Sequence, residues 1–366
     1  MSSFESAQHP NGPTVSISDS DVVPRVSVVI VAYNRKEYIL QAVQSVLEQS
    51  VPRQTFEIIV IKNFRDLQVD GFLDSNGVRV IGYEREPWGE VLARGVLAAR
   101  GDVVSLLDDD DAFEPTKLER VQQQFDRHRD VVFFRDGVVA VTERGEEIAG
   151  WSRTSFPTPP KPVEIHPGSY DAANLRAVAT WFPCVIASAM SLKRSILLDS
   201  LDSLRQVTAG FDLYLFGVAA ATGKALIIDN QQLTRYRVHA LSTSHSKPGV
   251  PGLGIDQEFA RRQLAACETV VRLTRGTSAE SIGQVLQLIS RFRLALLSGD
   301  EPAPPLHSYF ALARLQLISP KINWLKAVLL LGFIKLFAPK IASQIYGMLA
   351  AWRLRQIDSL NPTREL

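Results

Sequence analysis

The sequence predicts an α/β protein in which a Rossmann-like, doubly wound and mostly parallel sheet is followed by an all-helical C-terminal region. Three observations support this prediction. Apolar runs without a polar face, such as Val26–Val31 and Val103–Leu107, are typical of strands that helices cover on both sides. These runs alternate with helical patterns at about 20–25 residues per βα unit. After Lys247–Gly254, which holds two prolines and three glycines, only helical patterns follow.

The elements can be assigned in chain order from their periodicity. In the first half we expect strands at Val26–Val31, Phe56–Ile61, Val78–Ile81 and Val103–Leu107, and helices at Arg35–Gln49 and Trp88–Arg100. Gly101 follows the second helix as a usual helix-ending residue. Further on we expect helices at Thr116–Arg129, Ser195–Leu204 and Phe211–Ala221, strands at Val131–Phe134, Ser188–Leu192 and Ala225–Asp229, and helical patterns at Asp256–Leu297 and Leu306–Ile318.

Composition sets the domain organisation and excludes some classes. Residues 1–23 are polar and lack the apolar core of a signal peptide, so we expect a disordered leader on an intracellular protein. Residues 24–246 should form the α/β domain, 247–254 a linker, 255–318 a helical region, 319–357 basic apolar helices, and 358–366 a tail. With 40 basic and 39 acidic residues, no overall field would attract nucleic acid. Cys184 and Cys267 have no metal-ligand spacing.

Four consecutive aspartates, Asp108–Asp111, follow the strand at Val103–Leu107. Carboxylates crowded beside a buried strand repel one another, so we expect a cation there. Because ligands of open α/β sheets bind at the ends of strands, a divalent cation that holds a phosphorylated substrate is the economical interpretation. The alternative is an acidic turn that caps the helix starting near Thr116.

Polar side chains also follow the first two strands. Tyr33 and Asn34 come after the first strand, where Tyr33 offers an aromatic surface for a nucleotide base and Asn34 is expected to cap the next helix. Lys62 and Asn63 come after the second strand. Since the ends of parallel strands meet at one edge of a sheet, these residues and the aspartates predict a binding site.

Together these segments resemble the family 2 glycosyltransferases of GT-A fold, of the non-processive type. The resemblance covers about 24–246, which would be the catalytic domain, and it is specific as an ensemble. The segments that carry it are Val26–Arg35, Glu57–Ile61, Gly101–Asp111, Phe211–Leu215 and Leu233–His239. A member of this family is expected to move a hexose from a nucleotide-diphosphate sugar to an acceptor hydroxyl or lipid phosphate, with inversion and with a metal ion, in glycan or glycolipid assembly.

The resemblance also implies roles for single residues. Asp108-x-Asp110 matches the DxD motif, in which Asp108 would contact the ribose or bridge to the metal. Asp110 would ligate Mn²⁺ or Mg²⁺, with His239 as a second ligand. Asp212 matches the general base that deprotonates the acceptor; its plainer interpretation is a first-turn charge that complements the helix dipole. The substrate-binding residues would be Val31, Tyr33, Asn34, Asn63, Asp108 and Asp109, although Asp109 and Asp111 are also interpreted as turn and helix-entry residues.

Three departures from the family pattern leave alternatives open. Lys62 and Asn63 replace acidic residues that contact the base, so the nucleotide could be UDP or GDP. Val91-Leu92-Ala93 replaces an Arg-Asn pair, and Ala209-Gly210 replaces a glutamate before Asp212. These changes would also fit a decayed, non-catalytic nucleotide-sugar-binding scaffold. A sugar nucleotidyltransferase is disfavoured because Ala32-Tyr33-Asn34 stands where a Gly-rich phosphate loop would be.

A short signature separates two branches of the family. Gln231-Gln232 precedes Arg235-Tyr236, an arrangement similar to the signature of processive synthases. Processive relatives carry several long membrane spans after this signature, whereas the longest uncharged runs in the C-terminal region of this chain are far shorter than a span. We therefore expect the two glutamines to be turn residues and the segment at Arg235 to be the end of a strand.

The C-terminal region differs in composition from the rest of the chain. Between Ala303 and Ile357 there is no Asp or Glu, and seven Lys and Arg residues give it a charge of +7. Within Trp324–Trp352 the longest uncharged runs, of 8 and 12 residues, fall short of the ~20 that a membrane span needs. We favour interfacial helices on anionic lipid, with Trp324, Tyr346 and Trp352 at headgroup depth, over a helical pair packed on the first domain or a second subunit. The protein would then be peripheral on the inner face of the cell membrane, with a lipid-linked acceptor.

Overall fold

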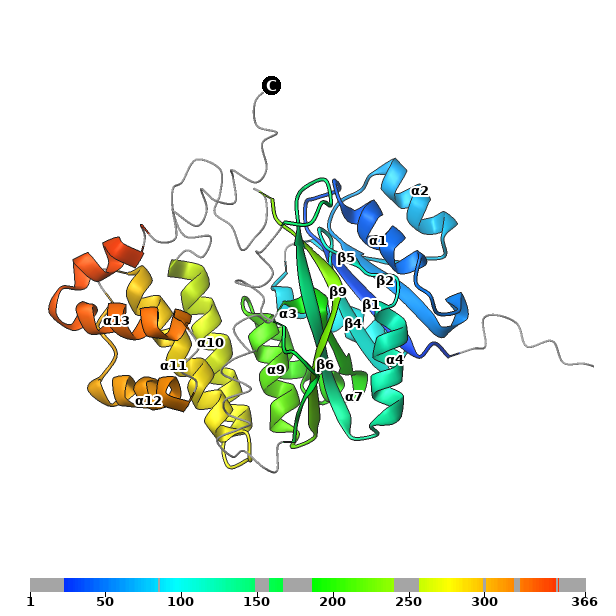
Figure 1. Ribbon diagram of the computed structural model, residues 1–366. Helices are drawn as coiled ribbons and strands as arrows, with labels where there is room; N and C mark the ends of the chain where they lie inside the picture. The colour runs from blue at the N-terminus through cyan, green and yellow to red at the C-terminus, as the bar shows by residue number, and fades with distance from the viewer. Residues whose placement is uncertain are drawn as a thin grey trace, which may run out of the picture.

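The computed structural model describes residues 23–84, 86–148, 158–166, 186–239, 257–298, 301–318, 323–346 and 348. Nearly all of the predicted leader, the linker 247–254 and the tail 358–366 lie outside the described residues. Figure 1 shows the α/β domain at one end of the molecule and the C-terminal helices at the other.

The first half of the sheet is parallel, as predicted. Its strands are β1 (Val26–Ala32), β2 (Phe56–Lys62), β3 (Arg79–Gly82) and β4 (Val103–Asp108), in the spatial order β3-β2-β1-β4. In this register Val31 of β1 lies between Ile61 of β2 and Asp108 of β4. The carboxyl ends of the three strands therefore meet at one edge, which is the arrangement that the predicted site requires.

The second half of the sheet is mixed. Antiparallel to β4 runs β8 (Met190–Lys193), and antiparallel to β8 runs β6 (Val131–Val141). Next to β6, and parallel to it, lies β9 (Ala225–Arg237), which pairs with two short strands, β5 (Ala112–Phe113) and β7 (Val163–Ile165). Two 3₁₀ turns, Arg53–Thr55 and Ala187–Ala189, precede β2 and β8.

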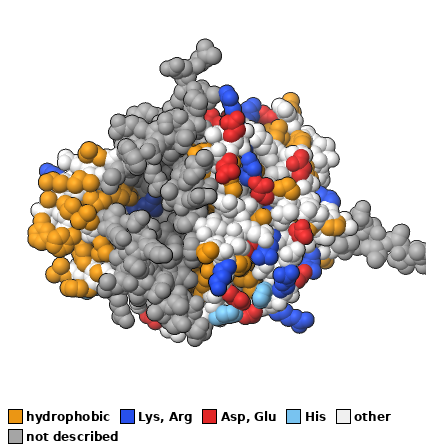
Figure 2. Space-filling model, in the orientation of Figure 1, with side chains coloured by type: hydrophobic (Ala, Val, Ile, Leu, Met, Phe, Trp, Pro, Cys, Tyr) orange, Lys and Arg blue, Asp and Glu red, His pale blue; other side chains and the backbone are white. Residues whose placement is uncertain are grey.

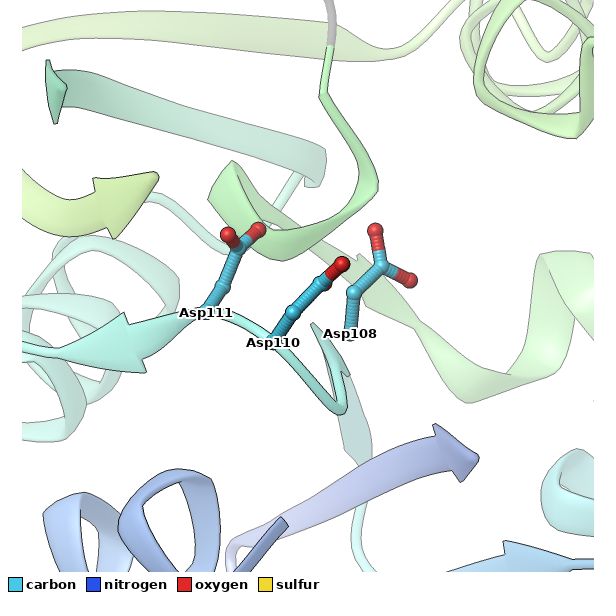
Figure 3. Close-up of side chains that lie close together, drawn as sticks. All are labelled: Asp108, Asp110 and Asp111. Carbon is cyan, nitrogen blue, oxygen red and sulfur yellow. The ribbon is translucent and has the colours of Figure 1, made fainter. Parts of the chain in front are cut away.

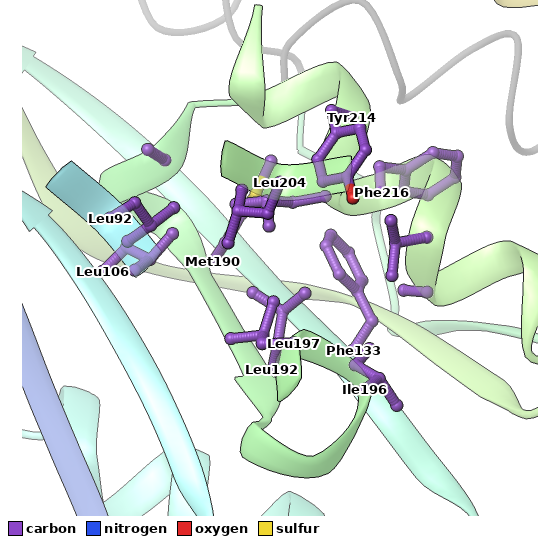
Figure 4. Close-up of a cluster of buried hydrophobic side chains, with 14 of the residues drawn as sticks. Leu92, Leu106, Phe133, Met190, Leu192, Ile196, Leu197, Leu204, Tyr214 and Phe216 are labelled. Atoms are coloured by element: carbon purple, nitrogen blue, oxygen red, sulfur yellow. The ribbon is translucent and has the colours of Figure 1, made fainter. Parts of the chain in front are cut away.

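Helices cover both faces of this sheet (Figure 1). One face is covered by α1 (Ile39–Leu47), α2 (Leu67–Ser75) and α4 (Lys117–Arg127), and the other by α3 (Trp88–Ala98), α7 (Arg194–Asp199), α8 (Leu201–Arg205) and α9 (Phe211–Ala221). Successive residues of β1 alternate between these two cores, which explains why the strand has no polar face. Figure 4 shows part of the second core, where Phe133 packs edge-on against Phe216.

Several element boundaries differ from the prediction. The first helix begins at Ile39 rather than Arg35, with Tyr38 as its N-cap, so the capping role expected of Asn34 is wrong. Asn34 instead adopts a left-handed backbone (φ 51°) and its side chain pairs with Asn63. The expected turn at Gln231-Gln232 is also wrong, because both glutamines lie within β9. Their pairing with β6 is a long-range feature that local periodicity does not record.

The C-terminal helical region packs against α9. The predicted helical stretch consists of two helices, α10 (Gln257–Thr274) and α11 (Glu280–Leu297), followed by α12 (Leu306–Ile318) and α13 (Asn323–Phe337). A Cβ atom on Gly217 of α9 would lie 2.3 Å from Cγ1 of Val270 on α10, so the two helices approach closely where only glycine fits. Among the described helices, none has both the length and the apolar character to cross a membrane.

Candidate active site

The four aspartates form the turn between β4 and β5. Asp108 is the last residue of β4, and its carbonyl accepts a hydrogen bond of 3.2 Å from the backbone N–H of Asp111. The helix that follows begins only at Lys117, and its N-cap residue Thr116 makes no side-chain capping bond. The helix-capping alternative for the aspartates, and the helix-entry role of Asp111, are therefore wrong.

Three of these carboxylates can hold a hard cation. Oxygen atoms of Asp108, Asp110 and Asp111 lie within 4.8 Å of one another, and Figure 3 shows the three carboxyl groups on the same side of the turn. Mn²⁺ and Mg²⁺ prefer oxygen ligands of this kind. The residues present thus fit the metal that the DxD motif implies.

A guanidinium supplies part of the positive charge that the aspartates require. Arg35, in the turn after β1, pairs with Asp109 through Nη2 and lies 2.8 Å from Asp110 Oδ2 through Nη1. His239, just beyond the end of β9, places Nε2 2.9 Å from the same Asp110 oxygen. The structure thus brings together the two residues that the resemblance implies as metal ligands, Asp110 and His239.

Asp111 is anchored from two sides. Its Oδ2 accepts a hydrogen bond of 2.6 Å from Ser188, and its Oδ1 accepts one of 2.9 Å from the backbone N–H of Arg237. Ser188 also accepts the backbone N–H of Asp108 at 3.0 Å. Asp111 therefore ties the turn to β9 and to the segment before β8.

Burial and mutual repulsion shift the protonation of the cluster. Burial, followed by the charges of Asp110 and Asp109, raises the pKa of Asp108 to about 8. Burial likewise raises the pKa of Asp109 to about 7, although Arg35 opposes the shift. Burial also acts on Asp110, but its bond with His239 and the charge of Arg35 hold its pKa below the usual value. The most acidic member of the cluster is thus the residue of the DxD motif expected to ligate the metal.

A buried ion pair supports the turn from behind. Lys117 of α4 pairs with Asp136 of β6, and both side chains are fully buried. Lys117 Nζ also donates to the Ser188 carbonyl at 3.2 Å and to Thr234 Oγ1 at 3.1 Å. Burial lowers the pKa of Lys117 and raises that of Asp136. This network fixes the segment that carries Ser188 and, through it, Asp111.

An aromatic surface lies at the end of β1. The Tyr33 ring is 39% exposed, and its centroid is 5.7 Å from that of Trp88, the first residue of α3. Asn63 accepts the backbone N–H of Asn34 at 2.7 Å and donates to the Asn34 side chain at 2.8 Å. The residues predicted to contact the donor therefore converge at the ends of β1 and β2.

Lys62 does not occupy this surface. Its ammonium lies 2.6 Å from the carboxylate of Asp70 on α2 and donates to the carbonyl of Phe64 at 2.5 Å, and its side chain is only 5% exposed. Lys62, which departs from the family pattern, therefore points into the protein. Asn63 is the next polar residue at the end of β2, and its side chain is only partly buried.

Asp212 lies in the first turn of α9, after Gly210, whose left-handed backbone (φ 67°) begins the helix. This conformation favours glycine over the glutamate common in the family. The Asp212 side chain is half-buried, and burial raises its pKa to about 6, opposed by the backbone N–H of Leu213. Its charge is close enough to raise the pKa of Asp108 further, after the effects of burial and the neighbouring aspartates. The charge of Asp212 thus reaches the aspartate turn from the first turn of α9.

Sequence reasoning did not single out four residues of this site: Arg35, Trp88, Ser188 and Arg237. Arg35 could have been predicted from the sequence, because four neighbouring aspartates repel one another and need a cation nearby. Arg35 is the first basic residue after β1. Arg237 donates to the Asp110 carbonyl at 2.9 Å and stacks on Tyr38, with 4.7 Å between the guanidinium carbon and the ring centroid. No local pattern marks this contact, which joins residues more than a hundred positions apart.

A comparison with solved structures identifies the fold. Residues 1–349 of S. aureus TarS, solved in complex with UDP-GlcNAc, superimpose with a TM-score of 0.55 at 13% identity, over 91% of this chain and 92% of that chain. At this identity the likeness shows the fold alone, and the fold is the GT-A fold of glycosyltransferases.

Sequence comparison supports the predicted family. Residues 27–198 match the model described as glycosyl transferase family 2. CgeD of Bacillus subtilis is 24% identical over 145 residues, which are 36% of this chain and 34% of CgeD. The uncharacterized glycosyltransferase YwdF of the same organism is 31% identical over 106 residues, 28% of this chain and 38% of YwdF. These matches support the predicted resemblance to family 2 glycosyltransferases for residues 27–198, and the matched part of the chain spans little more than a third of these two relatives.

Proposed function

We propose that this chain is an inverting, metal-dependent glycosyltransferase that moves a hexose from a nucleotide-diphosphate sugar to an acceptor hydroxyl. The observation that carries the proposal is the cluster of Asp108, Asp110 and Asp111 at the carboxyl edge of the sheet, which the charge of Asp212 on α9 reaches. A cluster that can hold a cation marks the leaving-group side, and a carboxylate of raised pKa marks the acceptor side.

On the donor side, the base would stack on the exposed ring of Tyr33, supported by Trp88. Asn63 offers both an acceptor and donors to the edge of a base. The solved TarS complexes contain UDP-GlcNAc or UDP, so UDP-sugars are the first donors to test and GDP-sugars the second. Asp108 would contact the ribose, and Val31, Asn34 and Asp109 would line the same pocket.

Asp110 and His239 would hold Mn²⁺ or Mg²⁺, with Asp108 and Asp111 close by. When bound, the ion neutralises charge on the diphosphate leaving group. Around it, Arg35 provides a second positive charge at Asp109 and Asp110. With the ion bound, the metal and Arg35 together would place positive charge where negative charge develops on the leaving group.

On the acceptor side, Asp212 would act as general base. It takes the proton of the acceptor hydroxyl while that oxygen bonds to the anomeric carbon from the face opposite the diphosphate. The bond between the anomeric carbon and the phosphate oxygen breaks, and the nucleoside diphosphate leaves with the electron pair. One displacement of this kind inverts the anomeric centre. The raised pKa of Asp212, about 6, leaves it mostly ionised at neutral pH and more basic than an ordinary aspartate.

The variant Asp110→Asn tests the metal side. We expect it to lose the Mn²⁺-dependent part of UDP affinity in calorimetry and to stop Mn²⁺-dependent release of nucleoside diphosphate. Asp202→Asn is the matched control, because the Asp202 side chain is 98% exposed and lies outside the site. Unchanged Mn²⁺ coupling in Asp110→Asn would overturn the metal role.

The unaltered protein tests the activity itself. Proton NMR of the product formed from an α-linked donor should show a β-linked sugar. A protein that binds UDP and Mn²⁺ but transfers no sugar to any acceptor or to water would instead be the non-catalytic scaffold, and a product of retained configuration would overturn the single displacement.

A further inference from the structure

The outer side of the C-terminal helices carries a row of exposed apolar side chains. On α13, Leu330, Phe333 and Phe337 follow one another at intervals of three or four residues, which places them on one face, and Ile341 is exposed in the helical turns after α13. On α12, Leu306 and Phe310 stand four residues apart. With Met348, these side chains are between 52% and 76% exposed. We call these seven residues the helical apolar surface.

The helical apolar surface lies on the side of α13 that faces away from the protein core. The opposite side of α13 already packs inward, where Leu329 and Leu336 contact the core of Phe292 and Tyr309. A Cβ atom on Gly332 would lie 2.6 Å from the Phe292 ring, so α13 sits close against α11. α13 is therefore apolar on the side that packs on the protein and on the side that does not, and a helix that is apolar all round normally has neighbours all round.

Figure 2 shows hydrophobic side chains gathered over the end of the molecule that α12 and α13 form, whereas charges of both signs cover the visible part of the α/β domain. Larger exposed apolar patches on proteins mark binding surfaces for a partner or a membrane. In this view the composition of the helical apolar surface therefore differs from that of the visible part of the α/β domain.

The charge of the surrounding segment favours a membrane over a second copy of the chain as the partner of this surface. From Ala303 to Ile357 the sequence has seven Lys and Arg residues and no Asp or Glu, and among the described side chains Lys340 is exposed at the border of the apolar residues. A symmetric contact between two copies of the chain would bring this positive segment against itself. An anionic lipid surface offers both an apolar layer and opposite charge.

We propose that the helical apolar surface docks on the headgroup and outer acyl layer of an anionic membrane, with the helices lying in the plane of the interface. Phe333 and Phe337, whose ring centroids are 5.3 Å apart, form its most prominent aromatic pair. Their rings would enter the acyl boundary while Lys340, at the border of the surface, meets lipid phosphates. This proposal does not rest on the proposed transfer reaction, since docking needs no donor, metal or turnover.

Co-sedimentation of the full chain with phosphatidylcholine vesicles, with and without phosphatidylglycerol, tests the proposal. We expect binding to the mixed vesicles that weakens as salt is raised. The double variant Phe333→Glu/Phe337→Glu should bind at least about tenfold more weakly, because two buried rings are lost. Lys340→Gln should bind about fivefold more weakly to the vesicles that contain phosphatidylglycerol, and its binding to pure phosphatidylcholine vesicles should not change.

Leu67→Glu is the matched control, because Leu67 is 95% exposed on α2 and lies outside the helical apolar surface. It should bind like the unaltered protein. The double variant must keep the circular dichroism spectrum and melting temperature of the unaltered protein, which its exposed positions allow. Three results would overturn the proposal: no binding to the mixed vesicles, equal binding by the double variant, or a dimer in light scattering that the double variant abolishes while vesicle binding persists.

Discussion

The pH dependence of sugar transfer is the most direct consequence of the environment of Asp212. Burial raises its pKa from 3.8 to about 6. A general base acts only when ionised, so turnover should fall about tenfold per pH unit below pH 6. At pH 5 about one tenth of Asp212 would be ionised, whereas an aspartate of ordinary pKa would remain more than nine tenths ionised. The raised pKa thus predicts a loss of about tenfold between pH 7.5 and pH 5.

The assay is the turnover number at saturating donor and Mn²⁺, followed by release of nucleoside diphosphate from pH 4.5 to pH 8. Under saturation the profile reports ionisation in the substrate complex rather than donor binding. Titration of UDP and Mn²⁺ at pH 5 and pH 7.5 confirms that both sites stay filled. A turnover number that stays level down to pH 5 would refute either the raised pKa or the role of Asp212 as base.

Stability provides a second measurement of the same pKa. Because the folded-state pKa of Asp212 lies above its unfolded value, folding favours the protonated form. The stability that this protonated form contributes is present below about pH 4 and is lost as the pH rises through about 6. Asp212→Asn removes the ionisation, so its free energy of unfolding should exceed that of the unaltered protein at pH 7.5, by at most about 3 kcal/mol. Near pH 4 the two proteins should unfold at nearly the same urea concentration. A variant that is less stable at pH 7.5 would contradict the assigned burial.

Two further predictions concern the groups that hold the aspartate turn. Lys117→Met leaves Asp136 buried without its partner and should lower the free energy of unfolding in urea by about 3–5 kcal/mol. The double variant Lys117→Met/Asp136→Leu should restore much of this loss. Equal losses of stability in the single and double variants would exclude a coupled pair. Arg35→Met removes the guanidinium that a metal ion must compete with at Asp109 and Asp110, so Mn²⁺ should raise the melting temperature by about 2–4 °C more than in the unaltered protein. A smaller Mn²⁺ shift in this variant would show that Arg35 supports metal binding instead.

The outline of the fold could be predicted because its signals are local. The apolar runs of β1, β2 and β4 show burial on both faces, and their lengths match the strands within one or two residues. The first helix was predicted four residues too early because Asn34 adopts a left-handed backbone, which no helical period shows. β6 and β9 are longer than predicted because their later residues are held in strands by pairing with each other. Local periodicity predicted only the apolar first part of each strand.

The amino-acid sequence predicts four carboxylates at the carboxyl edge of a parallel sheet, beside Tyr33 and Asn63, because consecutive βα units bring the ends of their strands to one edge. Which of those carboxylates are paired depends on contacts that form only in the folded chain. Arg35 reaches Asp109 and Asp110 across neighbouring strands, and Arg237 fixes Asp111 through its backbone N–H. Such contacts join segments that are far apart in the chain. They set the pKa values of the four aspartates and the net charge of the site. The same holds for the C-terminal helices, where composition showed the basic apolar character and packing decided which side remained exposed.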